Sequence, residues 1–361
     1  MNVSRSAGFS GIAAVSSLLI AILILLHPQL AFQSLLQGFE IAFCRVVPAV
    51  FPMMIVSGMI LESPLAHWLG LFFYPYTRLL GIRDRSVSTL LFLGLLGGFA
   101  VLSQGIDRLY RSRQIDRTQA ELLLCAGLNA GPSFILLSVG FGMLGSVGSG
   151  LLLLTALYLG NLCAALLLRT FSFRRRVDHK GSSPTALNEG FPRSGSLEAS
   201  MQKAVTSCIT LCGYIAFFCL LCTLAQELLS PEAAGALCAI LEATNGALFA
   251  ANLATCPRML FLLGILSWTG VSIQMQAKAL LPEEITLRYF YLSRILAIPL
   301  SFVFFGIAVR LFPQAVPTMA GHIPRVSRFS GGIVISFLLM VAAFLYECTP
   351  KASLRSRQKG I

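Results

Sequence analysis

Long apolar runs alternate with short polar segments along most of the chain. The runs cover residues 9–26, 39–61, 125–140, 146–169, 204–228, 259–281, 288–312 and 331–346. A helix needs about 20 mostly apolar residues to cross a membrane, and inside the bilayer the backbone groups can be satisfied only within helices or closed barrels. The short alternating pattern that is typical of strands is missing. The sequence therefore predicts an all-α integral membrane protein with about eight transmembrane helices.

Helix-breaking or polar residues interrupt this pattern at four places. Gly97 and Gly98 lie in the middle of an apolar segment, and the others are "CAGLNAGPSFILLSVG" at 125–140, "CAILEATNGALFAANL" at 238–253 and "LLGILSWTGVSIQMQAKALL" at 262–281. Backbone groups freed at membrane depth are tolerated only where protein or a water-filled cavity satisfies them. The interruptions therefore predict a solute site, and the alternative is a set of kinked helices that serve only packing.

Lys and Arg residues predict which side of the membrane each loop occupies. The segment 86–105 has arginines on both flanks, which favours a re-entrant hairpin that returns to the inside, whereas 231–253 has no cation before Arg258 and predicts a hairpin that enters from outside. Full spans are the alternative for both. Both termini are predicted inside, and residues 64–81, with Trp68, Tyr74 and Tyr76, are predicted to lie in the membrane interface.

The order of the segments predicts two inverted repeats, each with a span, a hairpin, an interrupted span and a closing span. Secondary transporters often have this architecture, with the site near the midplane between the repeats. We predict an N-terminal transmembrane helix and outer loop at 1–38, a first repeat at 39–172, and a polar cytoplasmic linker at 173–200. A second repeat follows at 201–313, and a loop, a last transmembrane helix and a basic tail occupy 314–361.

Composition supports the membrane assignment and excludes several functions. Hydrophobic residues make up 56% of the chain and charged residues 12%, and the mean hydropathy is +0.79. The net charge of +12 fits an inner surface that faces anionic lipids and needs no nucleic-acid partner. Most cysteines lie in apolar segments and the four histidines are scattered, so we predict no metal site, no cofactor and no enzymatic activity. The oligomeric state stays open, with a homo-oligomer among the options.

Three stretches, "LLLCAGLNAGPSFILLSVGFGMLGS", "GALCAILEATNGALF" and "SWTGVSIQMQ", resemble signatures of the YlbJ-like sporulation integral membrane proteins, over roughly residues 39–312. The resemblance implies nucleoside-recognition (Gate) domains, a fold similar to concentrative nucleoside transporters, and passage of dipicolinic acid during endospore formation. Two departures concern the site: the family pattern Ser-Gly-Tyr-Pro is Gly97-Gly98-Phe99-Ala100 here, and the Ser of Asn-Ser-Gly-Pro is Ala130.

The prediction is a transporter of a small polar solute, namely a small carboxylate such as dipicolinic acid. A nucleoside-type solute and a non-transporting membrane assembly protein of sporulation are the alternatives. We predict a multi-pass protein of the cell membrane. The resemblance implies a membrane that surrounds the forespore as a further possible location. Ionisable groups at membrane depth are costly and therefore functional candidates. The candidate substrate-binding residues are Gly97, Gly98, Asn129, Gly131, Pro132, Ser133, Glu242, Thr244, Asn245, Gly246, Thr269, Gly270, Gln274 and Arg294.

Overall fold

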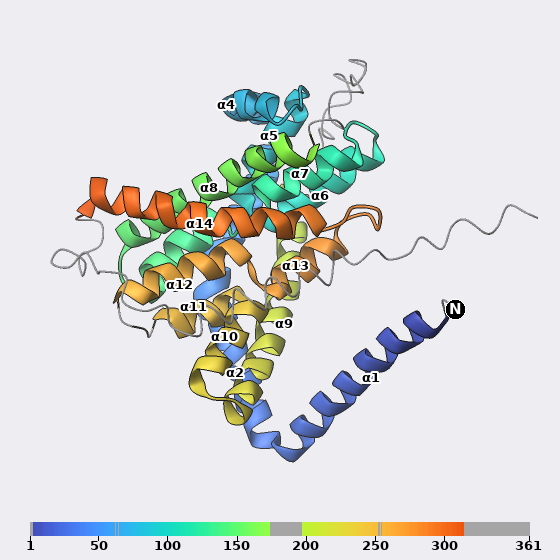
Figure 1. The fold of residues 1–361 in the computed structure, drawn as a ribbon, viewed down its shortest axis with the longest axis vertical. Coiled ribbons are helices and arrows are strands. Elements are labelled where there is room, and N and C mark those ends of the chain that lie inside the picture. Colours follow the sequence, from blue (N-terminus) through green and yellow to red (C-terminus); the bar gives the residue numbers. More distant parts are fainter. Residues whose placement is uncertain are drawn as a thin grey trace, which may run out of the picture.

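The computed structural model describes residues 3–61, 63, 65–173, 197–251, 253 and 255–313. Every regular element in these ranges is a helix (Figure 1). The predicted last span at 331–346, the rest of the segment 314–361 and most of the linker 173–200 lie outside the described residues. The linker prediction also extended too far, because residues 197–200 already belong to a helix.

Five helices of the described part are long and apolar enough to cross a membrane: Pro28–Ile60, Val147–Phe171, Ser200–Leu228, Arg258–Ala279 and Arg288–Leu311. The all-helical membrane fold is thereby confirmed, whereas the number of crossings stays a prediction. The first predicted span is the helix α1 (Val3–Leu26), which extends away from the other helices in Figure 1.

The residues that were predicted to form an outer loop after the first span are helical instead. α2 (Pro28–Ile41) continues through a π-helical turn η1 (Ala42–Val46) into α3 (Val47–Leu61). Pro28 stands at the first turn of α2, where a proline fits a helix without loss of a hydrogen bond. α2 packs along α9 (Leu197–Leu228), and Gly38 lets the two backbones approach closely. The loop prediction was wrong because the polar residues of this segment suggested a loop. The helix α9, on which the segment packs, lies far away along the chain and gives no local signal.

α4 (Leu65–Leu79) covers the segment predicted to lie in the interface, and it packs on α5 (Arg85–Gly97). Gly70 of α4 lies directly against Thr89 of α5. The side chains of Trp68 and Phe72 are 71% and 78% exposed. An amphipathic helix of this kind fits the interface, whose occupation stays a prediction.

A hairpin, an interrupted helix and a long helix follow one another in the first half of the chain. α5 and α6 (Phe99–Arg111) fold back on each other at Gly98, and Gly94 and Gly105 pack on Leu102 and Leu90 across the hairpin. α7 (Arg117–Gly127) is separated by residues 128–133 from η2 (Phe134–Met143). α8 (Val147–Leu168) and its π-helical end η3 (Arg169–Phe173) close the series.

The same order returns in the second half. α10 (Pro231–Leu241) and α11 (Ala243–Ala251) form a hairpin that bends at Glu242, and Gly235 and Gly246 of this hairpin pack on Phe249 and Ala239. α12 (Thr255–Trp268) and α13 (Gly270–Ala279) are interrupted at Thr269, and α14 (Arg288–Leu311) is the long helix. The predicted bends and interruptions are confirmed. α8 and α14 make the most extensive helix contact of the described residues, and their ribbons cross in Figure 1.

Candidate functional site

Each hairpin bend packs against the break of its own interrupted helix. Gly98 has φ 81°, and a Cβ built on it would lie 3.8 Å from the nitrogen of Gly131. Gly270 has φ 76°, and a Cβ on it would lie 2.8 Å from the nitrogen of Ala243. The positive φ favours glycine at both positions, and at Gly270 the approach of the two backbones also leaves no room for a Cβ. The two halves of the chain thus bring their irregular backbone together in the same way.

Three of the four irregular segments meet at one small cavity of about 60 Å³. The hairpin bends at Gly98 and Glu242 and the break at Gly131 line it, together with α3 and α9. The candidate residues that line the cavity are Gly97, Gly98, Gly131, Ser133, Glu242 and Thr244. The sequence did not indicate the remaining polar lining residue, Ser207 of α9, because it lies in an uninterrupted helix.

Two helices begin at this cavity without a side-chain cap. α6 starts after Gly98, and the helical stretch that continues as η2 starts at Pro132, directly after Gly131, so the residue before each start is a glycine without a capping side chain. Phe99, Ala100, Ser133 and Phe134, in the first turns of these helices, line the cavity. The first backbone N–H groups of a helix have no partner within it, and they carry a partial positive charge. The cavity is therefore bordered by two positive helix ends.

Glu242 supplies the charged side chain of the cavity lining. The residue is only 2% exposed and stands immediately before α11, where Oε2 accepts a hydrogen bond of 2.7 Å from the backbone nitrogen of Asn245. A carboxylate at this position satisfies the helix terminus and interacts favourably with its dipole. Asn245 and Gly246 lie in the first turn of α11 but are not part of the cavity lining.

Asn129 and Arg294 lie together in a polar cluster outside the cavity. The guanidinium of Arg294 donates to the side-chain oxygens of Asn129 and Asn161 and, over 2.8 Å, to the carbonyl of Leu128. The amide of Asn161 donates to Asn129 over 2.6 Å. Arg294 is fully buried and lies over the ring of Phe290 at 4.3 Å. The hydrogen bonds of Arg294 thus go to amide and carbonyl oxygens, and the ion pairs found among the described residues do not join it to Glu242.

The other candidate residues of the second interruption also serve the backbone. Gln274 donates its side-chain amide to the carbonyl of Trp268 over 2.9 Å, and Thr269 adopts a left-handed conformation with φ 69°. Trp268 in turn donates its indole N–H to the carbonyl of Ile240 at the end of α10. Pro132, Thr269, Gly270 and Gln274 do not line the cavity. Their positions shape the breaks that surround it.

Tyr158 of α8 is a residue that the sequence analysis missed. Its hydroxyl donates to the carbonyl of Leu95 in α5 and to that of Ala130 in the first break, over 2.8 and 3.1 Å. Tyr158 thus donates to a carbonyl near the end of the first helix of the first hairpin, as Trp268 does for the second hairpin. A tyrosine inside an apolar run gives no local signal of this role, because its two acceptors lie 63 and 28 residues away along the chain.

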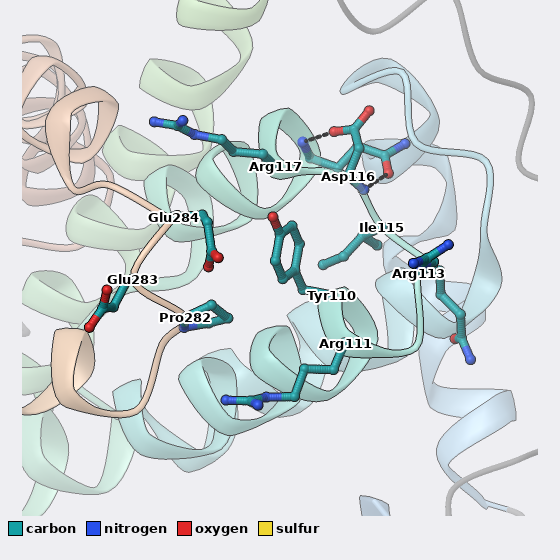
Figure 2. Close-up of a pocket in the computed structure, with 11 residues that line it drawn as sticks. Tyr110, Arg111, Arg113, Ile115, Asp116, Arg117, Pro282, Glu283 and Glu284 are labelled. Atoms are coloured by element: carbon teal, nitrogen blue, oxygen red, sulfur yellow. Dashed lines mark hydrogen bonds between the residues drawn. The ribbon is translucent and has the colours of Figure 1, made fainter. Parts of the chain in front are cut away.

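A larger pocket of about 820 Å³ lies between the α6–α7 turn and the loop that precedes α14 (Figure 2). Figure 2 shows Tyr110, Pro282 and Glu284 around the space, with Arg111 and Arg117 at its sides. None of its lining residues belongs to a helix break, so we do not take it as the site. It shows that two loops predicted to face the inside lie next to each other. Lys278 holds the second loop by donating to the carbonyls of Pro282, Glu283 and Ile285.

Comparison with known proteins gives one informative relative. The chain is 28% identical over 153 residues to the "Sporulation integral membrane protein YlbJ" of Bacillus subtilis (strain 168). The match covers 42% of this chain and only 37% of the length of that relative. No protein-family model matches the chain, and no solved structure matches it. The relative supports the resemblance to the YlbJ-like sporulation membrane proteins and the multi-pass membrane location, whereas it does not test the Gate domains.

Proposed function

We propose that the protein transports a small carboxylate, such as dipicolinic acid during endospore formation, across a membrane. The observation that carries the proposal is the cavity at which two hairpin bends and one helix break meet among apolar helices. Irregular backbone at such a place lines solute sites in secondary transporters. The sporulation relative supports the physiological setting.

The preference for an anion rests on the two uncapped helix ends at the cavity. Backbone N–H groups at the start of α6 and η2 can bind carboxylate oxygens without any cationic side chain. The candidate Arg294 and the nearby cation Lys278 of α13 both bind internal carbonyls. The carboxylate of Glu242 is partly compensated by the N–H groups of α11. The arrangement selects a solute by its hydrogen-bond acceptors.

The cavity has to widen before a solute enters. A volume of about 60 Å³ holds a few water molecules, at about 10–15 Å³ each, whereas sites for small organic ligands measure about 300–1,000 Å³. The glycine contacts between bend and break are non-covalent and lie on separate elements, so the elements can separate. The described conformation corresponds to a closed site in an alternating-access cycle.

We further propose that the two series of hairpin, interrupted helix and long helix are inverted repeats with Gate-like folds. The matching order of the elements supports this, as does the contact between the two closing helices α8 and α14. The protein then functions as a carrier and not as an enzyme, with the solute and the surrounding lipid as its partners.

Uptake by liposomes that contain the purified protein tests the proposal. Dipicolinate is expected to accumulate in the vesicles, its diamide and uridine much less, and affinity is expected to fall as the pH drops through the pKa values of the solute. Equal uptake of acid and diamide would favour the nucleoside-type alternative. Absence of uptake for all three solutes, with a correctly folded protein in the vesicles, would favour an assembly role.

A further inference from the structure

Helix α9 carries a polar face inside the membrane. Lys203, Thr206, Ser207, Thr210 and Tyr214 recur at intervals of three or four residues, which places them on one side of a helix. All of them lie within the apolar span Ser200–Leu228. The hydroxyls of Thr206 and Thr210 donate to carbonyls of their own helix over 3.0 Å. The charge of Lys203 is costly against lipid, and charged side chains at depth turn to the bundle interior or to a water-filled cavity.

The polar face of α9 borders an open cavity of about 450 Å³. Gln104 of α6 and Gln276 of α13 contribute amide groups from the opposite walls. The cavity extends to Gln202, near the beginning of α9, and to Leu280, just past the end of α13. A second open cavity of about 220 Å³ lies beside it, between α3, α6 and α9, and includes Arg108 and Lys203.

Both open cavities meet the small cavity of the site at the same place. Ala100 of α6 and Ser207 of α9 line all three cavities. Ala100 lies in the first turn of α6, directly after the bend at Gly98. The two open cavities thus lie next to the closed one, with Ala100 and Ser207 between them.

We propose that this polar face of α9 is one wall of the route by which the solute reaches the site from the side of the membrane on which Lys203 lies. This inference rests on the proposed transport function and adds to it the route and its lining. Arg108 and Lys203 at the mouth attract an anion, and the amides and hydroxyls further in replace its water without binding it as tightly as a cation would. Ser207 marks the point where the route enters the closed site.

Thiol accessibility distinguishes a water-filled route from a lipid-facing surface. Thr206 and Thr210 are replaced by cysteine one at a time, and Val205→Cys and Ile209→Cys on the other face of α9 are the matched controls. Val205 and Ile209 are exposed side chains, 41% and 67% respectively, so neither control disturbs the core. A charged, membrane-impermeant thiosulfonate is added to each side of sealed vesicles, with wild-type protein as the background for the native cysteines.

The two threonine positions are expected to react at least about tenfold faster than the two controls, and from one side only, because a thiolate forms in water and not in lipid. That side is expected to be the one from which cysteine at Ser112 reacts. Equal rates at Thr210→Cys and Ile209→Cys, or reaction from both sides, would overturn the route.

Modification of Ser207→Cys connects the route with transport. Block of dipicolinate uptake by the reagent in this variant, with no block in Ile209→Cys, supports the route. Fast labelling of the threonine positions in a protein that moves no solute also supports the water-filled cavity but refutes the transport function. Uptake that continues after complete modification at Ser207 overturns the route and leaves the transport function standing.

Discussion

Several buried polar residues of this protein satisfy the backbone at helix breaks. Arg294 is the clearest case, because a fully buried cation binds the carbonyl of Leu128 and the amides of Asn129 and Asn161 rather than a carboxylate. The carbonyl end of α7 carries a partial negative charge, which compensates the guanidinium. Asn129 is likewise engaged, since its amide donates to the carbonyl of Ala126. The residues that looked like solute ligands are thus parts of the support of the site.

Replacement of Arg294 by Gln is expected to destabilise the fold rather than to change solute charge selectivity. Each buried carbonyl that loses its donor costs about 1–3 kcal/mol. Thermal unfolding in detergent should show a lower midpoint, and uptake of dipicolinate and of its diamide should fall by the same factor. Arg310→Gln, at an exposed position near the end of the same helix, is the control and should behave as wild type. A normal midpoint combined with selective loss of the acid would assign Arg294 to the solute.

Helix ends in this protein are completed by side chains of other helices. The hairpins expose the carbonyl ends of α5 and α10 at their bends, and Tyr158 and Trp268 donate to Leu95 and Ile240 there. Elsewhere local caps suffice, as at α7, where Asp116 and Gln119 form a capping box. An uncapped positive end is left where α6 and η2 meet the cavity. Among the described helices, α2, α13 and α14 also begin without a side-chain cap, so it is their place at the cavity that sets the starts of α6 and η2 apart.

Tyr158→Phe tests this role of the long helices. The substitution removes one hydroxyl and leaves the carbonyls of Leu95 and Ala130 without that donor, at a cost of about 1–3 kcal/mol. The midpoint of thermal unfolding should fall, and hydrogen exchange should rise at the first hairpin more than at the second. Tyr214→Phe in the open cavity is the control and should leave both values unchanged. Uniform exchange across both hairpins would contradict a local capping role.

At the scale of the whole molecule, some of the described loops lie at two separate places. The α6–α7 turn and the loop before α14 share one pocket, whereas residues 23–35 around the α1–α2 turn pack near Leu220 and Leu224, close to the end of α9. Loops that lie next to each other at one end of a membrane-spanning bundle face the same side of the membrane. This agrees with the Arg and Lys pattern, which predicts the first set inside and the second outside.

Labelling of single cysteines tests this grouping. Cysteine at Ser112 and at Glu283 should react with an impermeant thiol reagent from the same side, and cysteine at Gln29 and at Glu232 from the opposite side. The expected side of Ser112 in cells is the cytoplasm. Wild-type protein and detergent-opened vesicles are the controls for native thiols and for total reactivity. Reaction of Ser112 and Glu283 from opposite sides would rule out the hairpins as described.

Much of the element structure could be predicted because its causes are local. The Gly97-Gly98 pair and the Asn129–Pro132 segment lower the local stability of a helix, although single prolines such as Pro52 and Pro299 stand inside helices here. Apolar length defines the spans. The helix α2 was missed because its stability depends on a groove of α9. The candidates that line the cavity come from the bends and the break, where the sequence carries a local signal, whereas Ser207 and Tyr158 gave none.

The sequence by itself determined the solvent, the helical class and the positions of the breaks, because bilayer solubility and glycine or proline conformation depend on neighbouring residues only. The tertiary structure decided which polar groups face the cavity and which satisfy carbonyls. Glu242 and Ser133 line the cavity, while Asn129, Gln274 and Arg294 turn to the backbone. These choices depend on partners that lie far apart in the chain, and each buried donor binds the nearest unsatisfied acceptor that packing brings to it.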